Sequence, residues 1–436
     1  MTPATIGLIG ILVMLVLFTT RMPVAFVMGV VGFVGFSVLT SVQGGLNMLS
    51  RAMYEVFVSY DLTTIPLFIL MGQLAFNAGI SRRLFSTAHH FFGHIRGGLA
   101  MATVTSCTAF GAVCGSSPAT AATMATVAIP EMKRFGYGDR LAAGAVAAGG
   151  GLGMVMPPSV VLIVYGVLTE QSIGQLFVAG ILPALLLTGL FLLAIMISCR
   201  RRPELGPPCA AHSWSARFKS LTGLIDTLVI FGLVMTGLSK GWFTPTEAAS
   251  VGAFGVLVMG VVRRQLGVKL IMKSLEETLR TSCMILFLVA GAVVFGKFLA
   301  VTRIPFTTAS FIGSLDIPAM AVLGLIVLIY FVGGCFMDSL AMVMLTVPVF
   351  FPVIVNLGFD PIWFGVIIVL ITEMGVITPP VGINVYVVYG VTTSMKQNIS
   401  LESIFRGIYP FLLATFAGVL ILTLFPDIVT CLPYAM

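Results

Sequence analysis

The sequence contains two short stretches that resemble one another and recur at one fixed offset. The interval from Ser116, in Gly115-Ser116-Ser117-Pro118, to Pro157 equals the interval from Asp338 to Pro379. We call the offset that carries Ser116 onto Asp338 the repeat shift. The same shift carries several isolated landmarks onto one another: Pro23 onto Pro245, Pro130 onto Pro352, Gly136 onto Gly358 and Gly153 onto Gly375. Because the landmarks keep their spacing through most of each half, the sequence predicts two structurally equivalent repeats.

The composition restricts these repeats to a membrane. Only 9% of the 436 residues are charged and 58% are apolar, with a mean hydropathy of +1.10. Soluble domains carry about 25% charged residues. Apolar stretches of roughly 17 to 25 residues suit helices that cross a bilayer core, and no alternating pattern suggests a barrel. We therefore predict an all-α integral membrane protein in contact with lipid, and we interpret its basic excess as a topology signal rather than as a nucleic-acid surface.

The apolar pattern divides the chain into repeat 1 (1–199), a polar linker (200–219) and repeat 2 (220–436). In repeat 1 we expect helices at 5–20, 23–41 and 62–80, a hairpin at 97–130, a proline-broken helix at 139–168 and a long helix at 173–199. In repeat 2 we expect helices at 221–238, 245–262 and 279–300, a hairpin at 317–354, a broken helix at 361–392 and a last helix at 403–430. Short polar stretches at 44–60 and 263–278 are predicted to lie along the interface.

The basic residues predict the orientation of the repeats. On this map, 19 of the 23 Lys and Arg fall on one side of the membrane, which should be cytoplasmic. Each half has five full spans, an odd number, so the second half must enter the bilayer from the opposite face. The repeats are therefore predicted to be inverted, with both termini outside the cytoplasm.

The two hairpins follow from length and charge. Residues 97–130 are too few for two full spans and a turn, and both flanks, Arg96 and Lys133, are basic. This segment is therefore predicted to enter and leave on one side, with Ser116-Ser117-Pro118 near the midplane. Non-helical backbone is tolerated there only against protein or a wet cavity. Asp338 marks the opposite tip.

Broken helices at membrane depth leave backbone groups without helical partners. Free carbonyls with Ser and Thr hydroxyls suit a hard cation such as sodium, and helix N-termini favour an anion. We expect sodium site 1 at Ser116, Ser117, Gly153 and Met156, through the Met156 carbonyl, and sodium site 2 at Gly334, Asp338, Gly375 and Thr378. Substrate contacts are expected from Pro118, Pro158, Pro380 and Asn384. We also weigh Glu373 as either a functional carboxylate or a paired group within the bundle.

Several motifs resemble one transporter family. They are Gly-Ser-Ser-Pro-Ala-Thr-Ala at 115–121, Met-Pro-Pro-Ser at 156–159, Phe-Thr-Pro-Thr-Glu-Ala-Ala at 243–249, Asp-Ser-Leu-Ala at 338–341 and Thr-Pro-Pro-Val-Gly-Ile-Asn at 378–384. Together they are similar to the large membrane subunit (DctM type) of tripartite ATP-independent periplasmic (TRAP) transporters. The sequence departs from some members in having Gly111, Ala112, Val113 and Cys114 before the first tip, which favours carbonyl over hydroxyl ligands at site 1.

The resemblance implies a sodium-coupled permease of the bacterial inner membrane, with periplasmic termini, that imports a C4-dicarboxylate or similar organic acid. It implies two partners, a small membrane subunit and a periplasmic binding protein, and an elevator movement of hairpins and broken helices against a scaffold. It implies no catalysis and no cofactor other than the coupling sodium ions. Two alternatives remain open: a stand-alone sodium-driven carboxylate carrier of the same fold, and a membrane hydrolase, for which the sequence supplies no nucleophile set or acidic dyad.

Overall fold

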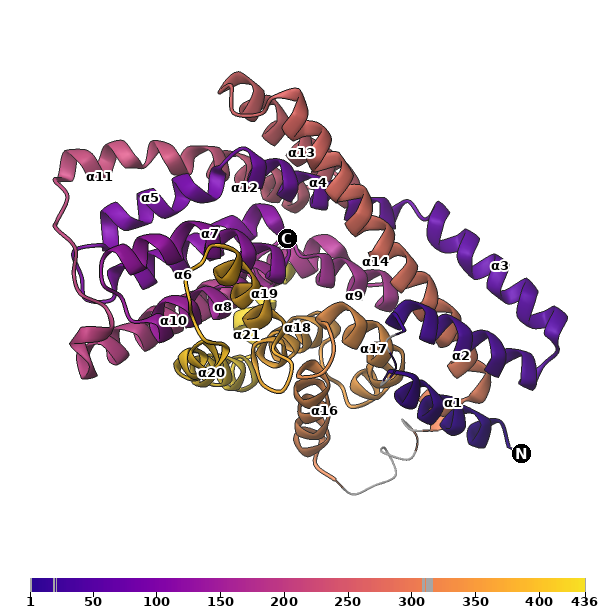
Figure 1. Ribbon diagram of the computed structural model, residues 1–436. Helices are drawn as coiled ribbons and strands as arrows, with labels where there is room; N and C mark the ends of the chain where they lie inside the picture. The colour runs from indigo at the N-terminus through magenta and orange to yellow at the C-terminus, as the bar shows by residue number, and fades with distance from the viewer. Residues whose placement is uncertain (1, 19, 21, 308–309, 311–316, 436) are drawn as a thin grey trace.

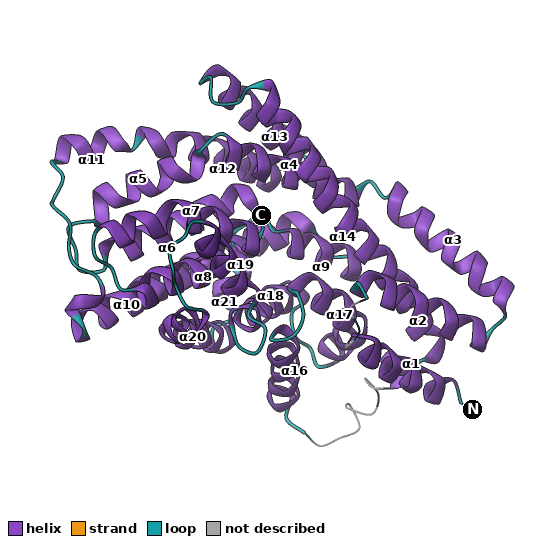
Figure 2. Ribbon diagram, viewed as in Figure 1, coloured by secondary structure: helices purple, strands orange, loops and turns teal. Residues whose placement is uncertain are grey.

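The computed structural model describes residues 2–18, 20, 22–307, 310 and 317–435 of the chain. Within these residues every regular element is helical, as Figure 2 shows. Seven helical segments are long and apolar enough to cross a membrane, and the bent pair α3 and α4 would make an eighth. The predicted fold class, an all-α membrane protein with two helical hairpins and two discontinuous helices, is confirmed.

The described part of the first half contains ten α-helices (Figure 1), which include one over 80–92 that the sequence does not predict and otherwise follow the predicted order. They are α1 (Pro3–Phe18), α2 (Val24–Leu39), α3 (Val42–Val58), α4 (Thr64–Asn77), α5 (Ile80–Phe92), α6 (Gly98–Cys114), α7 (Ser117–Arg134), α8 (Asp139–Val155), α9 (Val160–Thr169) and α10 (Ile173–Arg201). Helices α6 and α7 form the first hairpin, and α8 with α9 forms the first broken helix.

A polar linker with the short helix α11 (Trp214–Ser220) leads to the second half. The second half contains α12 (Thr222–Ser239), α13 (Pro245–Val262), α14 (Val268–Thr302), α16 (Ala319–Gly334), α17 (Ser339–Asn356), α18 (Pro361–Ile377), α19 (Ile383–Ser394), α20 (Leu401–Leu424) and α21 (Asp427–Thr430). Helices α16 and α17 form the second hairpin, and α18 with α19 forms the second broken helix.

Helix boundaries recur at the offset found in the sequence. Both ends of α17 lie one repeat shift after the corresponding ends of α7, and both ends of α18 lie one repeat shift after those of α8. In each broken helix the interruption holds a proline pair, Pro157-Pro158 or Pro379-Pro380, with a cis peptide bond between the two prolines. Proline cannot donate a backbone hydrogen bond, so a pair of prolines ends the regular helix.

One prediction about the second half is wrong. The sequence predicts a separate interfacial stretch at 263–278 before a helix at 279–300, but α14 is a single helix of 35 residues, Val268–Thr302. In the first half the equivalent elements α3 and α4 are separate and meet at an angle of 56°. The difference lies at the junction: Ser59 has an extended backbone and ends α3, whereas Lys, Leu, Met and Glu, which are good helix formers, carry α14 through its polar beginning.

The helices pack in two groups. Around the hairpins, α6, α7 and α20 pack against α8, while α16 packs against α18. In the other group, α2 packs against α14 and α13 against α4. Glycines allow the closest approaches: a Cβ on Gly291 would lie 2.3 Å from the carbonyl oxygen of Ala25, and a Cβ on Gly144 would lie 2.4 Å from that of Gly407. Figure 1 shows α1, α2 and α14 on one side of the molecule and α6, α8 and α10 on the other.

Candidate functional site

The tip of the first hairpin lies against the break of the first discontinuous helix. Gly115 has a left-handed backbone with φ of +65°, which glycine adopts readily. A Cβ at this position would lie 2.3 Å from the carbonyl oxygen of Pro158. The amide of Val160 donates a long hydrogen bond of 3.5 Å to the Gly115 carbonyl. The sequence therefore needs glycine here for two reasons, conformation and contact.

The tip of the second hairpin lies against the second break in the same way. The Val381 amide donates to the Cys335 carbonyl over 3.3 Å, and a Cβ on Gly375 would lie 2.6 Å from the Cα of Gly334. Asp338 caps α17 by accepting a hydrogen bond of 3.1 Å from the Leu340 amide. Each tip thus meets the broken helix of its own half, which is the pairing that the sequence predicted.

The residues proposed for site 1 gather around the first tip, but in different roles. Gly153 faces the hairpin, since a Cβ on it would lie 2.3 Å from Oγ1 of Thr120. Met156 is buried and ends α8. Ser116 lies at the wall of a cavity. The side chain of Ser117 points instead into a buried polar cluster.

The residues proposed for site 2 lie around the second tip. Gly334 and Gly375 are in backbone contact, and the Asp338 side chain borders the cavity. The hydroxyl of Thr378 donates to the Met374 carbonyl over 2.6 Å, so its proton is already committed within its own helix. Its oxygen keeps lone pairs that face away from that bond.

A buried cluster of three side chains joins the two halves. Ser117 Oγ donates to Oε1 of Glu373 over 2.9 Å, and Asn384 Nδ2 lies 2.7 Å from Ser117 Oγ and 3.1 Å from the same Glu373 oxygen. Asn384 Nδ2 also lies 3.2 Å from the carbonyl of Ala147 in α8. The cluster therefore links the first hairpin and first broken helix to the second broken helix.

Two oxygens of this cluster have no hydrogen-bond partner among the described residues, Glu373 Oε2 and Asn384 Oδ1. The carboxylate is held closely on another side, because a Cβ on Gly151 would lie 2.1 Å from Glu373 Oε1. The sequence-based assignment puts Ser117 and Asn384 in separate sites and does not join them to Glu373. The one available signal is an acidic residue inside the apolar stretch of α18.

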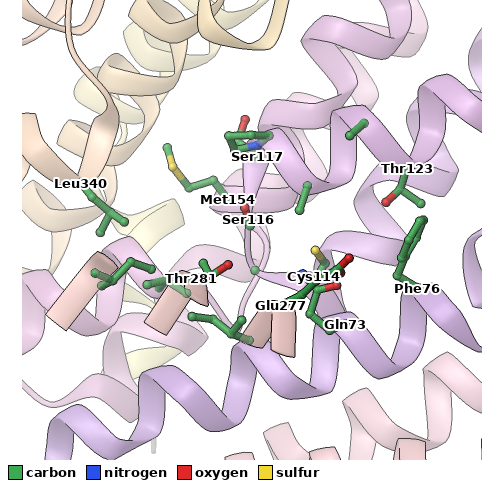
Figure 3. Close-up of a pocket in the computed structure, with 18 of the residues that line it drawn as sticks. Gln73, Phe76, Cys114, Ser116, Ser117, Thr123, Met154, Glu277, Thr281 and Leu340 are labelled. Atoms are coloured by element: carbon green, nitrogen blue, oxygen red, sulfur yellow. The ribbon is translucent and has the colours of Figure 1, made fainter. Parts of the chain in front are cut away.

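The two hairpin tips open on one cavity of about 480 Å³. Its walls include Ser116 to Ala119 from the first hairpin and Asp338 to Leu340 from the second. Across from them, α4 contributes Ile69, Gly72, Gln73 and Phe76, and α14 contributes Glu277, Thr281, Met284 and Ile285. Figure 3 shows Ser116, Ser117 and Leu340 around the cavity together with Gln73, Glu277 and Thr281. The cavity therefore lies between the hairpins and the second group of helices.

Of the four predicted substrate residues, one lines this cavity. Pro118 is in its wall. Pro158 is buried and faces Gly115, Asn384 is fully buried in the polar cluster, and Pro380 is exposed outside the cavity. Among the described residues, no group of three or more His, Cys, Asp or Glu side chains is placed to hold a metal ion.

Comparison with known proteins connects this geometry to a family. The profile of the family described as "Tripartite ATP-independent periplasmic transporter, DctM component" matches residues 11–428. The large permease protein of a C4-dicarboxylate TRAP transporter from Pseudomonas aeruginosa is 37% identical over 393 residues, which cover 89% of this chain and 90% of that protein. A sialic acid TRAP large permease from Vibrio cholerae is 33% identical, covering 94% of this chain and 95% of its own length.

The chain is also similar to a more distant permease and to a solved transporter structure. An ectoine/5-hydroxyectoine TRAP large permease from Ruegeria pomeroyi is 29% identical and covers 96% of each chain. Among solved structures, the YdaH transporter of Alcanivorax borkumensis has a TM-score of 0.66 at 16% identity, covering 89% of this chain and 90% of its own. This last likeness supports the fold alone. The chain is thus similar over most of its length to relatives that are named for different substrates.

Proposed function

The chain belongs to the DctM family, the large permease component of TRAP transporters, and from this premise we propose that it imports an organic acid coupled to sodium ions. The observation that carries the proposal is that both hairpin tips border the same cavity of about 480 Å³. Ligands in transporters built from repeats bind where broken helices meet near the middle of the membrane. The relatives of this chain are transporter permeases rather than enzymes, which supports a transport function.

Sodium is proposed to bind at the two tip-and-break contacts. Sodium is a hard cation that prefers oxygen ligands, and the carbonyl groups of Gly115 and Cys335 lie at these contacts, where they accept amide hydrogen bonds of 3.5 and 3.3 Å. We assign site 1 to Ser116, Ser117, Gly153 and Met156, and site 2 to Gly334, Asp338, Gly375 and Thr378. The geometry supports this assignment because each set gathers around its own tip.

The acid is proposed to bind in the cavity beside these ions. The N-terminus of α7 opens on the cavity, and its cap residue Ser116 makes no side-chain hydrogen bond to it. Helix N-termini carry partial positive charge and bind carboxylates. One end of an organic acid can therefore be held at the first hairpin tip.

The proposed movement separates the two groups of helices that form the cavity wall. The hairpins and broken helices form one side, while α4 and α14 form the other. We propose that the hairpin group slides as a body against these helices and carries the acid across the membrane. The buried Ser117, Glu373 and Asn384 cluster supports the idea that both hairpins move together, since it ties the first hairpin to the second broken helix.

The partners and the location follow from the family. TRAP large permeases work with a small membrane subunit and a periplasmic binding protein. We propose the same assembly here, in the bacterial inner membrane with both termini in the periplasm. The relatives are named for C4-dicarboxylate, sialic acid and ectoine, so the family by itself leaves the acid open.

The test is uptake into proteoliposomes that contain the large and small membrane subunits with the binding protein outside. Uptake of a labelled acid should require a sodium gradient, and Asp338→Ala should lower it at least tenfold by removing a proposed sodium ligand. Asp427→Ala is the matched control, because Asp427 is exposed on α21. Uptake that is independent of sodium would overturn the coupling, and sodium-driven uptake without any binding protein would favour a stand-alone carrier.

A further inference from the structure

We propose that the cavity selects an organic acid that also carries a positive group, and that Glu277 of α14 recognises that group. The inference rests on the proposed function, because it concerns the acid that the cavity receives. It distinguishes a zwitterionic substrate, with one carboxylate and one ammonium or amidinium group, from a dicarboxylate.

The charges around the cavity are the first observation. Two of its lining residues are charged, Glu277 and Asp338, and both are acidic. The described residues that line it include no Lys, Arg or His. Because Asp338 is a proposed sodium ligand, Glu277 is the acidic side chain of the wall that has no proposed ion beside it. A dicarboxylate would bring its second negative charge toward this carboxylate, and like charges placed close together repel.

The hairpin side of the cavity can hold one carboxylate. Ser339, at the first position of α17, lines the cavity, is only 2% exposed and has a hydroxyl without a hydrogen-bond partner among the described residues. A buried hydroxyl without a partner costs free energy until a ligand supplies one. The N-terminus of α7 lines the same cavity as Ser339, and together they form a polar wall that suits a carboxylate.

The opposite side of the cavity carries Glu277, whose charge is only weakly compensated. Its neighbour Lys273 has Nζ 3.8 Å from Glu277 Oε1, with both side chains substantially exposed. Such exposed pairs contribute little. Glu277 is therefore free to pair with a cationic group of the substrate.

The internal repeat provides a comparison. The pair Arg51 and Glu55 lies one repeat shift before Lys273 and Glu277. Glu55 is held at 2.9 Å by Arg51 and at 2.7 Å by a second cation, Lys297. The position equivalent to Lys297 in the other half is Ala75, which is fully buried in α4. Among the described residues, Glu277, which borders the cavity, therefore lacks the second cation that pairs with its repeat equivalent Glu55.

The two sides together define the ligand. A carboxylate bound at Ser339 and the α7 N-terminus leaves the rest of the molecule facing α14, where Glu277 favours an ammonium and disfavours a second carboxylate. A hydrogen bond to a charged group contributes roughly 1.5 kcal/mol or more, which corresponds to about tenfold in affinity.

The experiment measures binding of length-matched acids to the purified complex of the large and small subunits in sodium buffer. The probes are β-alanine against succinate and 4-aminobutyrate against glutarate, with ectoine as a cyclic zwitterion. Each zwitterion should bind about tenfold more tightly than its matched dianion. Glu277→Gln should narrow that ratio to near one, whereas Glu276→Gln should leave it unchanged, since Glu276 is exposed on the same helix and does not line the cavity.

The outcomes separate this inference from the proposed function. Sodium-dependent binding with the dianions equal or preferred, or an unchanged ratio in Glu277→Gln, would overturn the zwitterion assignment and leave the permease function intact. Failure of every acid in both classes to bind would overturn the cavity as the acid-binding site, and the proposed function with it.

Discussion

Ser117 Oγ donates a hydrogen bond of 2.9 Å to Glu373 Oε1, although the two residues lie in different halves of the chain. The bond joins the first residue of one hairpin helix to the middle of the second broken helix. Asn384 binds to both atoms and closes a three-residue cluster. The two halves of the chain therefore share polar interactions as well as apolar packing.

We expect Ser117 and Asn384 to depend on one another for stability. Ser117→Ala and Asn384→Ala should each lower the free energy of unfolding by about 1–3 kcal/mol, because each leaves buried groups without partners. The double variant should deviate from additivity by at least about 0.5 kcal/mol. Chemical denaturation of the purified complex measures the cycle. Ser116→Ala is the matched control. It should change the free energy of unfolding little, because the Ser116 side chain makes no capping hydrogen bond to α7. Full additivity of the two losses in free energy of unfolding would show that Ser117 and Asn384 are not coupled.

Gly151 should be intolerant of even one added carbon. Its Cβ would lie 2.1 Å from Glu373 Oε1, so Gly151→Ala must displace the carboxylate from Ser117 and Asn384. We expect a loss of about 1–3 kcal/mol, typical of overpacking, and reduced uptake. Gly189→Ala in α10 meets nothing within 4 Å and should be neutral or slightly stabilising. Melting temperatures of the two variants provide the comparison, and equal values would refute the close contact.

Asp226 should hold α5 in place. Its carboxylate is 3% exposed and lies 3.1 Å from Arg83 in α5 and 2.6 Å from Arg263 at the end of α13. Asp226→Asn removes the negative charge from both guanidinium groups and should cost about 1–3 kcal/mol. Hydrogen exchange should become faster in residues 80–92. The control is Glu402→Gln, because Glu402 pairs with Arg406 at the surface, where such pairs contribute little. Unchanged exchange in α5 would contradict this anchoring role.

The linker should loosen in acid. His90 and His212 have ring centroids 4.2 Å apart, and His89 lies 5.6 Å from His212. Burial, followed by neighbouring charge, lowers the pKa of His89 and of His212. The facing charged groups are Glu131, which opposes the shift at His89, and Arg217, which adds to that at His212.

The sign of the pH effect follows from these lowered pKa values. The unfolded segment, with histidine pKa near 6.5, takes up protons before the folded one does, so stability is complete above about pH 6.5 and falls as the pH decreases below it. Amide exchange near Cys209, whose amide binds the Gly93 carbonyl, should accelerate below that pH after correction for intrinsic rates. His212→Gln should weaken the dependence. Amide exchange near Cys209 that does not depend on pH would contradict a role for His89, His90 and His212 in holding the linker.

The order of the helices could be predicted from sequence because its signals are local. Apolar stretches indicate the spans, and glycine and proline mark the tips and breaks, as at Gly115 and Pro157-Pro158. The same reasoning fails at α14, where the polar stretch at 263–278 is interpreted as a separate element although most of it belongs to one continuous helix. Polarity indicates which side of a helix meets water, but a helix ends only where the backbone leaves helical geometry, as it does at Ser59.

The site could be predicted only in part. Periodicity located both tips, and the pairing of each tip with its own break followed from it. The hydrogen bonds of Ser117 with Glu373 and Asn384 depend on the packing of segments from opposite halves of the chain, which no local pattern encodes. The same holds for Glu277, whose position beside the tips depends on where α14 crosses the hairpins.

We propose that both hairpins form one body that moves against the helices across the cavity. The direct test is spin-label distance measurement in a cysteine-free complex, with one label at Arg134 at the end of α7 and a second at Val355 in α17 or at Val262 in α13. All three side chains are at least 46% exposed. When sodium and the acid are added, the distance from 134 to 262 should change while that from 134 to 355 stays constant. A constant distance from 134 to 262 under every condition, or a distance from 134 to 355 that changes, would contradict this movement.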